Sequence, residues 1–161
     1  MKTIDRIKGK LPLIISATIV LITLVALFVF SGQNGDESSA TSGVIVDFVV
    51  RLFNLPDDAE TLNTVTLIIR KLAHFTIFLI LGASLYSFTY FLNLPRPYIS
   101  TLIVGLASAT INELQQLTSP GRTASVRDVC IDFAGVVVGS LIVWGIVRIV
   151  KSRKNKKAVD K

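Results

Sequence analysis

The chain has 161 residues, of which 51% are hydrophobic and only 17% are charged, and its mean hydropathy is +0.63. Soluble domains usually carry about 25% charged residues, so these values argue against a soluble single-domain enzyme, and the abundance of apolar residues excludes a disordered chain. The single cysteine, Cys130, excludes an internal disulfide framework and a thiolate metal cluster. The net charge of +6 would suit a nucleic-acid partner, so the positions of the charges decide its meaning.

Four stretches of the chain are long and apolar enough to cross a bilayer, which takes about 20 residues of helix. They cover residues 11–30, 72–94, 98–118 and 129–147. The stretches are too uniformly apolar for the alternation of a membrane β-barrel, and lipid offers no partner to open backbone groups. The sequence therefore predicts an all-α membrane protein whose domain, residues 11–147, is a bundle of four transmembrane helices.

The first span follows a basic segment, residues 1–10, which is also how a secretory signal peptide begins. The apolar run that follows is longer than the roughly 7–15 residues of a signal peptide core, and no A-x-A cleavage site comes after it. We therefore expect an uncleaved transmembrane helix that is preceded by a cytoplasmic N-terminal segment.

The connection between the first two spans, residues 31–67, is expected to lie outside the cell. It opens with the turn-forming residues 31–35. Apolar residues then recur at helical spacing before Asn54-Leu55-Pro56, at Val44, Ile45, Phe48, Val49, Leu52 and Phe53. This pattern predicts a short external amphipathic helix between the first and second spans.

The other connections indicate the orientation in the membrane. Residues 93–97 are short and stiff enough only for a hairpin, and a basic tail, residues 148–161, ends the chain. With both termini in the cytoplasm, 12 of the 17 lysines and arginines lie on the cytoplasmic side, in accord with the positive-inside rule. The alternative for the tail is binding of nucleic acid or anionic lipid. Anchoring alone explains a basic cluster beside a span, and we expect no nucleic-acid partner.

Polar residues that lipid would exclude gather at one end of three predicted spans. A charge near the bilayer centre costs about 2.5–3.5 kcal/mol, so such residues need a reason to be there. The helical rise puts His74, Glu113 and Asp132 roughly 5–10 Å inside the outer boundary. The whole group comprises Arg70, Lys71, His74, Glu113, Gln116, Arg122, Arg127, Asp128 and Asp132. In the predicted orientation these residues face the extracellular side of the cytoplasmic (inner) membrane.

Spacing within the helices favours convergence of these side chains. Several pairs lie three or four residues apart and so share a helix face: Arg70 with His74, Glu113 with Gln116, and Asp128 with Asp132. Gly135 and Gly139 in the last span form a small-xxx-small pattern, which lets two helices approach closely. The sequence therefore predicts one polar, ligand-binding pocket at membrane level on the external side.

Each residue of this group also has a purely structural interpretation. Arg70 and Lys71 can anchor the end of a span at the interface, and His74 alone is more often a hydrogen-bonding residue than a base. Glu113 can form an ion pair with Arg122 or Arg127 that fixes the external loop. Taken as a set, polar groups from three helices favour a functional pocket.

The order of these motifs resembles that of the VanZ-like family of membrane proteins. Arg70-Lys71-Leu72-Ala73-His74-Phe75 looks like the R-K-x-x-H-F signature of that family. The later motifs E-x-x-Q, P-G-R, D-x-x-x-(N/D) and G-x-x-x-G are similar to residues 113–116, 120–122, 128–132 and 135–139 here. The resemblance covers about residues 28–147. Two positions differ: Asn112 stands where the family is often acidic, and Phe78 replaces a tyrosine.

The resemblance implies a four-span protein of the bacterial cytoplasmic membrane. The namesake of the family is associated with resistance to the glycopeptide teicoplanin, so the resemblance implies a role in the cell envelope and in antibiotic (glycopeptide) susceptibility. The expected partners are membrane lipids, a lipid-linked cell-wall precursor or a glycopeptide.

Two functions fit the predicted pocket. In the first, the pocket binds or shields an anionic lipid-linked envelope component, because guanidinium groups suit phosphate and carboxylate. In the second, the protein is an intramembrane hydrolase or transferase, with His74, Glu113 and Asp132 as its catalytic acid–base residues. A transporter is the weaker third option, since the inner halves of the spans offer no polar path.

We expect no cofactor and no metal ion. One histidine with scattered carboxylates provides too few ligands for a metal site, and the positive charges of neighbouring arginines would repel a metal cation. The residues specify no oligomeric state.

Overall fold

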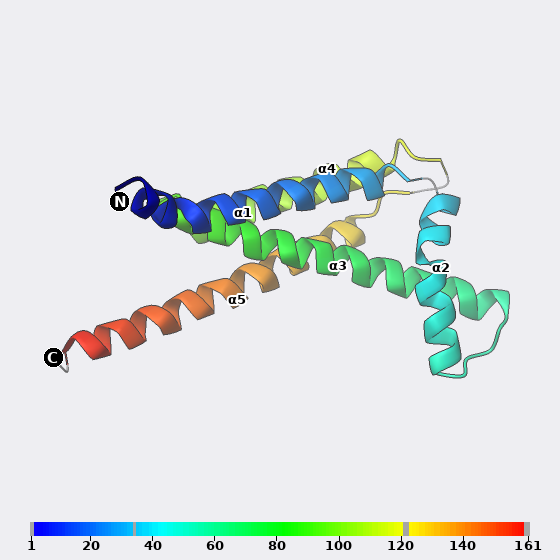
Figure 1. The fold of residues 1–161 in the computed structure, drawn as a ribbon. Coiled ribbons are helices and arrows are strands. Elements are labelled where there is room, and N and C mark those ends of the chain that lie inside the picture. The colour runs from blue at the N-terminus through cyan, green and yellow to red at the C-terminus, as the bar shows by residue number, and fades with distance from the viewer. Residues whose placement is uncertain (1, 34, 121–122, 160–161) are drawn as a thin grey trace.

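The computed structural model describes residues 2–33, 35–120 and 123–159, and these residues form five helices and no strand. In chain order the helices are α1 (Lys2–Ser31), α2 (Gly35–Leu52), α3 (Ala59–Phe91), α4 (Pro97–Gln116) and α5 (Val126–Val159). The four long helices run in alternating directions, and the shorter α2 lies crosswise over the first part of α3 (Figure 1). The prediction of an all-α protein is confirmed, with a helix between the first two long ones.

Three of these helices are long and apolar enough to cross a membrane. The segments are Lys10–Ser31 of α1, Ala59–Phe91 of α3 and Val126–Arg153 of α5. The third predicted span, residues 98–118, corresponds to α4, whose 20 residues give about 30 Å of helix. It carries Asn112, Glu113 and Gln116 near its C-terminal end, and it is not among the three helices that are apolar enough over a full membrane-spanning length.

Several helices extend beyond the predicted spans. α3 begins at Ala59 and not at Leu72, so residues 59–67, expected in an external loop, are helical. The side chain of Asp58 caps this helix and accepts a hydrogen bond from the Thr61 backbone N–H at 2.8 Å. α5 continues to Val159, through most of the basic tail. Hydropathy predicts which part of a helix lies in an apolar environment. The backbone hydrogen bonds of the helix can continue beyond that part.

The same three-residue sequence, Asn-Leu-Pro, terminates both α2 and α3. Asn54 and Asn93 adopt left-handed backbone angles, with φ of 50° and 59°, which asparagine tolerates better than most residues. After α3, the N–H groups of Asn93 and Leu94 donate to the carbonyls of Tyr90 and Thr89. This is a Schellman ending, and the proline that follows cannot extend the helix. α3 therefore stops at Phe91, short of the predicted Leu94.

α3 is the centre of the bundle, because it contacts each of the other four helices. Its residues Phe78, Leu81 and Leu85 form the buried core together with Leu27 of α1, Ala109 of α4 and Val136 of α5. Phe78 is completely buried, so the aromatic ring at this position packs the core.

Glycines bring α5 close to α3, as the sequence predicts. A Cβ atom on Gly139 would collide with the carbonyl oxygen of Leu79, and one on Gly135 would lie 3.0 Å from the backbone nitrogen of Leu79. From the other side, a Cβ atom on Gly82 would lie 2.6 Å from Cα of Val136. Close backbone contact therefore fixes the crossing of α3 and α5.

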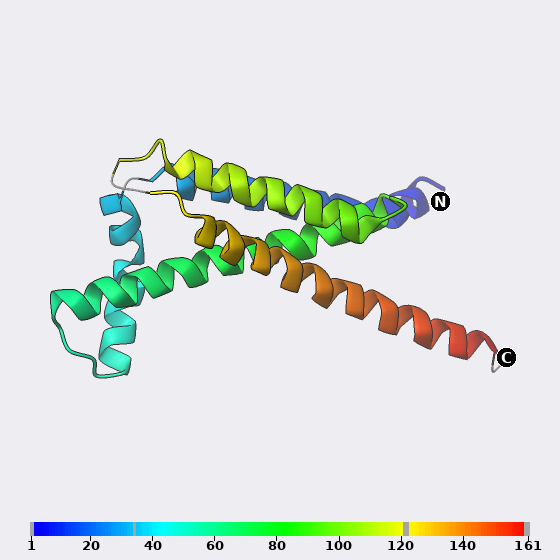
Figure 2. The same ribbon diagram turned by 180° about the vertical axis from the view of Figure 1, so that it is seen from behind.

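The two ends of the bundle differ in character. The start of α1, the α3–α4 connection and the end of α5 lie toward one end, with the last part of α5 diverging from the other helices, whereas α2 lies at the other end (Figures 1 and 2). The polar residues described next lie at the α2 end.

Candidate functional site: a polar cavity at one end of the bundle

A cavity of about 230 Å³ opens between α3, α4 and α5 at the α2 end of the bundle. We call it the polar cavity; it is lined by Leu67, Arg70, Lys71, His74, Glu113, Gln116, Thr123, Asp128, Ile131 and Asp132. Seven of the nine polar residues singled out in the sequence thus line one space. Helical spacing explains this convergence, since each helix contributes residues three or four apart.

A chain of polar contacts joins four helices through the wall of this cavity. Asp132, only 1% exposed, lies 3.6 Å from Nδ1 of His74, measured from Oδ1, and its Oδ2 accepts a hydrogen bond from Asn112 Nδ2 at 3.3 Å. Oδ1 of Asn112 in turn accepts a hydrogen bond from the hydroxyl of Ser31. His74, Asn112, Asp132 and Ser31 come from α3, α4, α5 and α1, so this network connects every long helix.

Glu113 connects α4 to the start of α5. One carboxylate oxygen accepts from Gln116 Nε2 at 3.0 Å, and the other accepts from the backbone N–H of Ser125 at 3.0 Å. Ser125 precedes α5; its carbonyl accepts from the N–H groups of Asp128 and Val129, and its hydroxyl oxygen accepts from the N–H of Arg127. Glu113 is 3% exposed. In the described part of the chain it is held by these neutral donors, and it forms no ion pair with Arg127.

The two basic residues of α3 differ in their partners. Lys71 forms an ion pair with Asp128 of α5, and both side chains are half-buried. Arg70 is also half-buried and lines the cavity. Among residues 2–33, 35–120 and 123–159 it has neither a carboxylate partner nor a side-chain hydrogen bond. Its guanidinium is therefore a cation facing the cavity without a protein partner there.

Two predicted site residues are not part of this lining. Arg127 is exposed, because a residue next to Asp128 on a helix points about 100° away from it. Arg122 lies outside the described residues. Cys130 is exposed as well.

Other residues of the site were not singled out in the sequence. In the sequence Asn112 stands out only as a difference from the family, although an amide in an apolar helix is itself a signal for a buried hydrogen bond. Ser31 reads as part of a turn, yet it is fully buried. Thr123 lines the cavity, and the backbone N–H of Ser125 donates to Glu113; both residues follow α4 in a connection whose path helical spacing does not predict.

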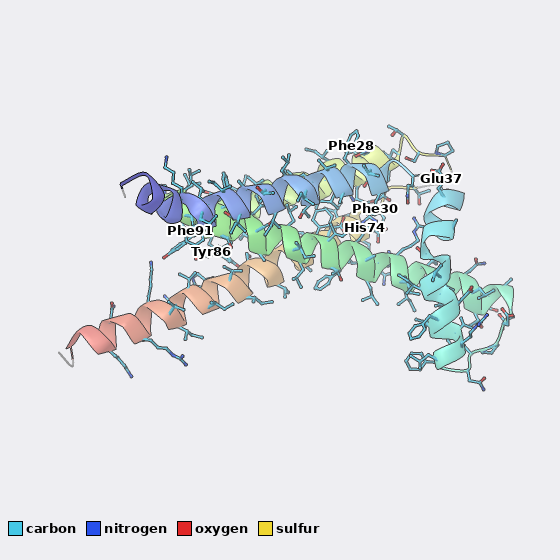
Figure 3. The ribbon with its side chains drawn as sticks, in the orientation of Figure 1. Phe28, Phe30, Glu37, His74, Tyr86 and Phe91 are labelled. Carbon is cyan, nitrogen blue, oxygen red and sulfur yellow. The ribbon has the colours of Figure 1, made fainter. Side chains whose placement is uncertain are left out.

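A second, largely apolar cavity of about 170 Å³ lies on the other side of Arg70 and His74, between α1, α2 and α3. We call it the apolar cavity; it is lined by Leu27, Phe30, Ser31, Gln33, Ser42, Ile45, Ile69, Arg70, Ala73, His74 and Ile77. Figure 3 shows Phe30 and His74 between α1 and α3 near this end of the bundle, far from Phe91 and Tyr86. Arg70 and His74 therefore belong to both cavities.

No group of three or more histidine, cysteine, aspartate or glutamate residues is arranged to hold a metal ion in the part of the chain that the structure describes.

These features define a multi-pass α-helical membrane protein with a polar cavity at one end of its bundle. The family model VanZ/LLP1 matches residues 16–149, so the chain belongs to the VanZ/LLP1 family. No curated protein and no solved structure matches the chain significantly.

Proposed function

We propose that the protein spans the cytoplasmic membrane four times, with both termini inside and the polar cavity open to the outside. Two observations support this. The four long helices alternate in direction (Figure 2), and 12 of the 17 basic residues lie in the segments assigned to the cytoplasm. α4 then crosses with its polar last turn at the external end, where Glu113 and Gln116 line the cavity.

Within this topology the protein binds an anionic, lipid-linked component of the cell envelope. The observation that carries this proposal is Arg70, the one charge of the described cavity lining without a protein partner. Asp128 faces Lys71, Asp132 faces His74, and Glu113 accepts two hydrogen bonds. With the carboxylates occupied, the free cation selects an anion, and a guanidinium suits the geometry of phosphate or carboxylate.

The test is binding of a lipid with a phosphate headgroup to the full-length protein in nanodiscs. Arg70→Gln should weaken binding roughly 30-fold or more, because it removes one member of a partly buried charge pair. Arg70→Lys should fall in between, since an ammonium keeps the charge but loses the bidentate geometry. Arg127→Gln is the matched control, because Arg127 is exposed and outside the cavity. Equal affinity of all four proteins would refute the proposal.

A consequence for glycopeptide susceptibility follows from this binding. If the protein shields an envelope lipid, cells that produce it should tolerate more teicoplanin than cells that produce Arg70→Gln at the same level. An unchanged inhibitory concentration would separate the binding site from glycopeptide resistance.

A second function, intramembrane hydrolysis or group transfer, is favoured by the pair His74 and Asp132. A buried carboxylate beside Nδ1 orients an imidazole and leaves Nε2 to act as a base on water or a hydroxyl. The separation of 3.6 Å is longer than a hydrogen bond, and such contacts commonly tighten when a ligand binds. Turnover of a lipid-linked phosphate that His74→Gln abolishes, with binding retained, would establish the enzyme; absence of turnover would leave the binding function.

A further inference from the structure

The polar and apolar cavities meet at two residues of α3. Arg70 and His74 line both spaces, and they lie four residues apart on one helix face. The remaining walls come from different elements, with α4 and α5 on the polar side and α1 and α2 on the apolar side. A cationic group and an imidazole thus mark the boundary between a polar and an apolar space.

We propose that the apolar cavity holds the first part of the hydrocarbon chain of the lipid whose phosphate headgroup occupies the polar cavity. This inference rests on the proposed function and adds the shape of the ligand to it. An amphiphile needs adjoining polar and apolar spaces, and its phosphate lies where headgroup and chain join. Arg70 stands at that junction, where one guanidinium can hold the phosphate while the chain passes along Ala73 and Ile77.

The apolar side chains of this cavity favour a hydrocarbon occupant over water. Leu27, Phe30, Ile45 and Ile77 come from three different helices, and the part of the wall that these side chains form gives water no hydrogen-bond partners. In a membrane the surrounding solvent is itself hydrocarbon, so a lipid chain enters such a cavity without crossing water. The headgroup then supplies most of the affinity, and the cavity fixes where the chain lies.

The experiment therefore measures the position of the hydrocarbon chain of the lipid. A phosphate lipid with a photoactivatable diazirine close to its headgroup is incorporated into phosphatidylcholine nanodiscs with the full-length protein, and the labelled residues are identified by mass spectrometry. We expect labelling of Leu27, which is 5% exposed, and of half-buried Ile77, because bulk lipid reaches these two cavity residues least. Labelling confined to outward-facing residues such as Ile103, which is 65% exposed, would overturn the inference.

Variants sharpen this result. Ala73→Phe fills the apolar cavity and should reduce labelling of its walls roughly tenfold, the factor that corresponds to about 1.4 kcal/mol of overpacking. Ala107→Phe, at an exposed position of α4 outside both cavities, is the matched control and should label like the wild type. Ile45→Trp fills the same cavity from α2 and replaces Ala73→Phe if that variant does not fold. Undiminished labelling in the folded filled variants would overturn the inference.

A chain-free probe separates this inference from the proposed function. Glycerol 3-phosphate has the headgroup chemistry without the chain, so its binding should depend on Arg70 and not on Ala73. If Ala73→Phe still binds glycerol 3-phosphate and its lipid labelling is unchanged, the apolar cavity is refuted as the site of the hydrocarbon chain. The headgroup site is then left intact. Binding that is indifferent to Arg70→Gln would refute the headgroup site itself.

Competition identifies the source of the phosphate. Unlabelled polyprenyl monophosphate and unlabelled phosphatidylglycerol are added in turn to the photolabelling reaction. Protection by either supports the inference and names the class of lipid, whereas protection by neither overturns it.

Discussion

Asn112 is the residue on which the hydrogen bonding of the cavity wall depends. Its amide donates to Asp132 and accepts from Ser31, so both of its polar atoms are used. An aspartate at the same position could accept from Ser31 but would offer no N–H group to Asp132, and two carboxylates would face each other. The amide therefore allows Asp132 to stay paired at 1% exposure.

This role predicts non-additive effects of substitutions at Ser31 and Asn112. Asn112→Leu keeps the approximate shape but leaves the Ser31 hydroxyl without its Asn112 partner and Asp132 with His74 alone, and each lost hydrogen bond of a buried group costs about 1–3 kcal/mol. Adding Ser31→Ala removes the hydroxyl that Asn112→Leu leaves without its partner, so the double variant should be no less stable than Asn112→Leu alone. Thermal unfolding of the four proteins in detergent measures the coupling. Strictly additive losses would show that the two side chains do not interact.

The candidate site could be predicted from the sequence only for residues whose spacing determines the direction in which the side chain leaves the helix. Arg70, His74 and Asp132 were expected in one pocket and line one cavity, because their helices and faces follow from periodicity. Arg127 was expected there too. Its neighbour Asp128 faces the cavity, so Arg127 points away from it and is exposed. Ser31 could not be recognised, since its burial depends on how α1 packs against α4.

At the scale of the element, the start of α3 depends on the cap provided by Asp58. Hydrogen bonds from Thr61 to the carboxylate lower the pKa of Asp58 below 3.8, its value in an unfolded chain. The cap therefore stabilises the helix fully above that value, and the stabilisation is lost as the pH falls through the lower, folded pKa. Asp58 is fully exposed, so the effect stays local to the first turns.

This linkage predicts fraying of the α3 N-terminus in acid. A nitroxide at position 63, in a Cys130→Ser background, should become more mobile as the pH falls below about 4, while a nitroxide in the bundle stays unchanged. Asp58→Asn keeps the capping oxygen but does not ionise, so its spectrum should not change over the same range. A pH response in Asp58→Asn equal to that of the parent protein would assign the fraying to another group.

The crossing of α3 and α5 makes a second prediction at this scale. Gly139→Ala puts a methyl group against the backbone of Leu79, which cannot rotate away, so the helices must separate at a cost of about 1–3 kcal/mol. Gly145→Ala on the same helix meets no atom within 4 Å and should be neutral or slightly stabilising. The unfolding midpoints of the two variants in detergent test this directly, and equal midpoints would contradict the close contact.

For the whole molecule, the proposed topology predicts which residues a membrane-impermeant thiol reagent can reach in intact cells. In a Cys130→Ser background, a cysteine at Glu37 should react from outside, whereas cysteines at Arg96 and Lys156 should react only after the membrane is permeabilised. Reaction of the Arg96 position in intact cells would mean that α4 does not cross the membrane.

From the sequence, the individual helices could be predicted better than the way they pack against one another. Apolar runs predict the four long helices, and the Asn-Leu-Pro sequences mark the turns after α2 and α3, although α3 ends at Phe91 and not at the predicted Leu94; these signals are local. The start of α3 at Ala59 and the extent of α5 could not be predicted, since polar helical turns outside an apolar run have no hydropathy signal. The central position of α3 depends on contacts with four other helices, which no single segment encodes.

The network of Ser31, Asn112, Asp132 and His74 has a consequence for how the bundle assembles. Lipid gives apolar helix faces little preference for one alignment over another, so a helix could slide along its neighbours at small cost. A slip of one turn, about 5.4 Å, would separate its polar residue from the others and leave a buried carboxylate, amide or hydroxyl unpaired. One polar residue from each long helix thus sets the vertical alignment of all four, and a chain inserted with the wrong register would be recognisable by its unsatisfied polar groups.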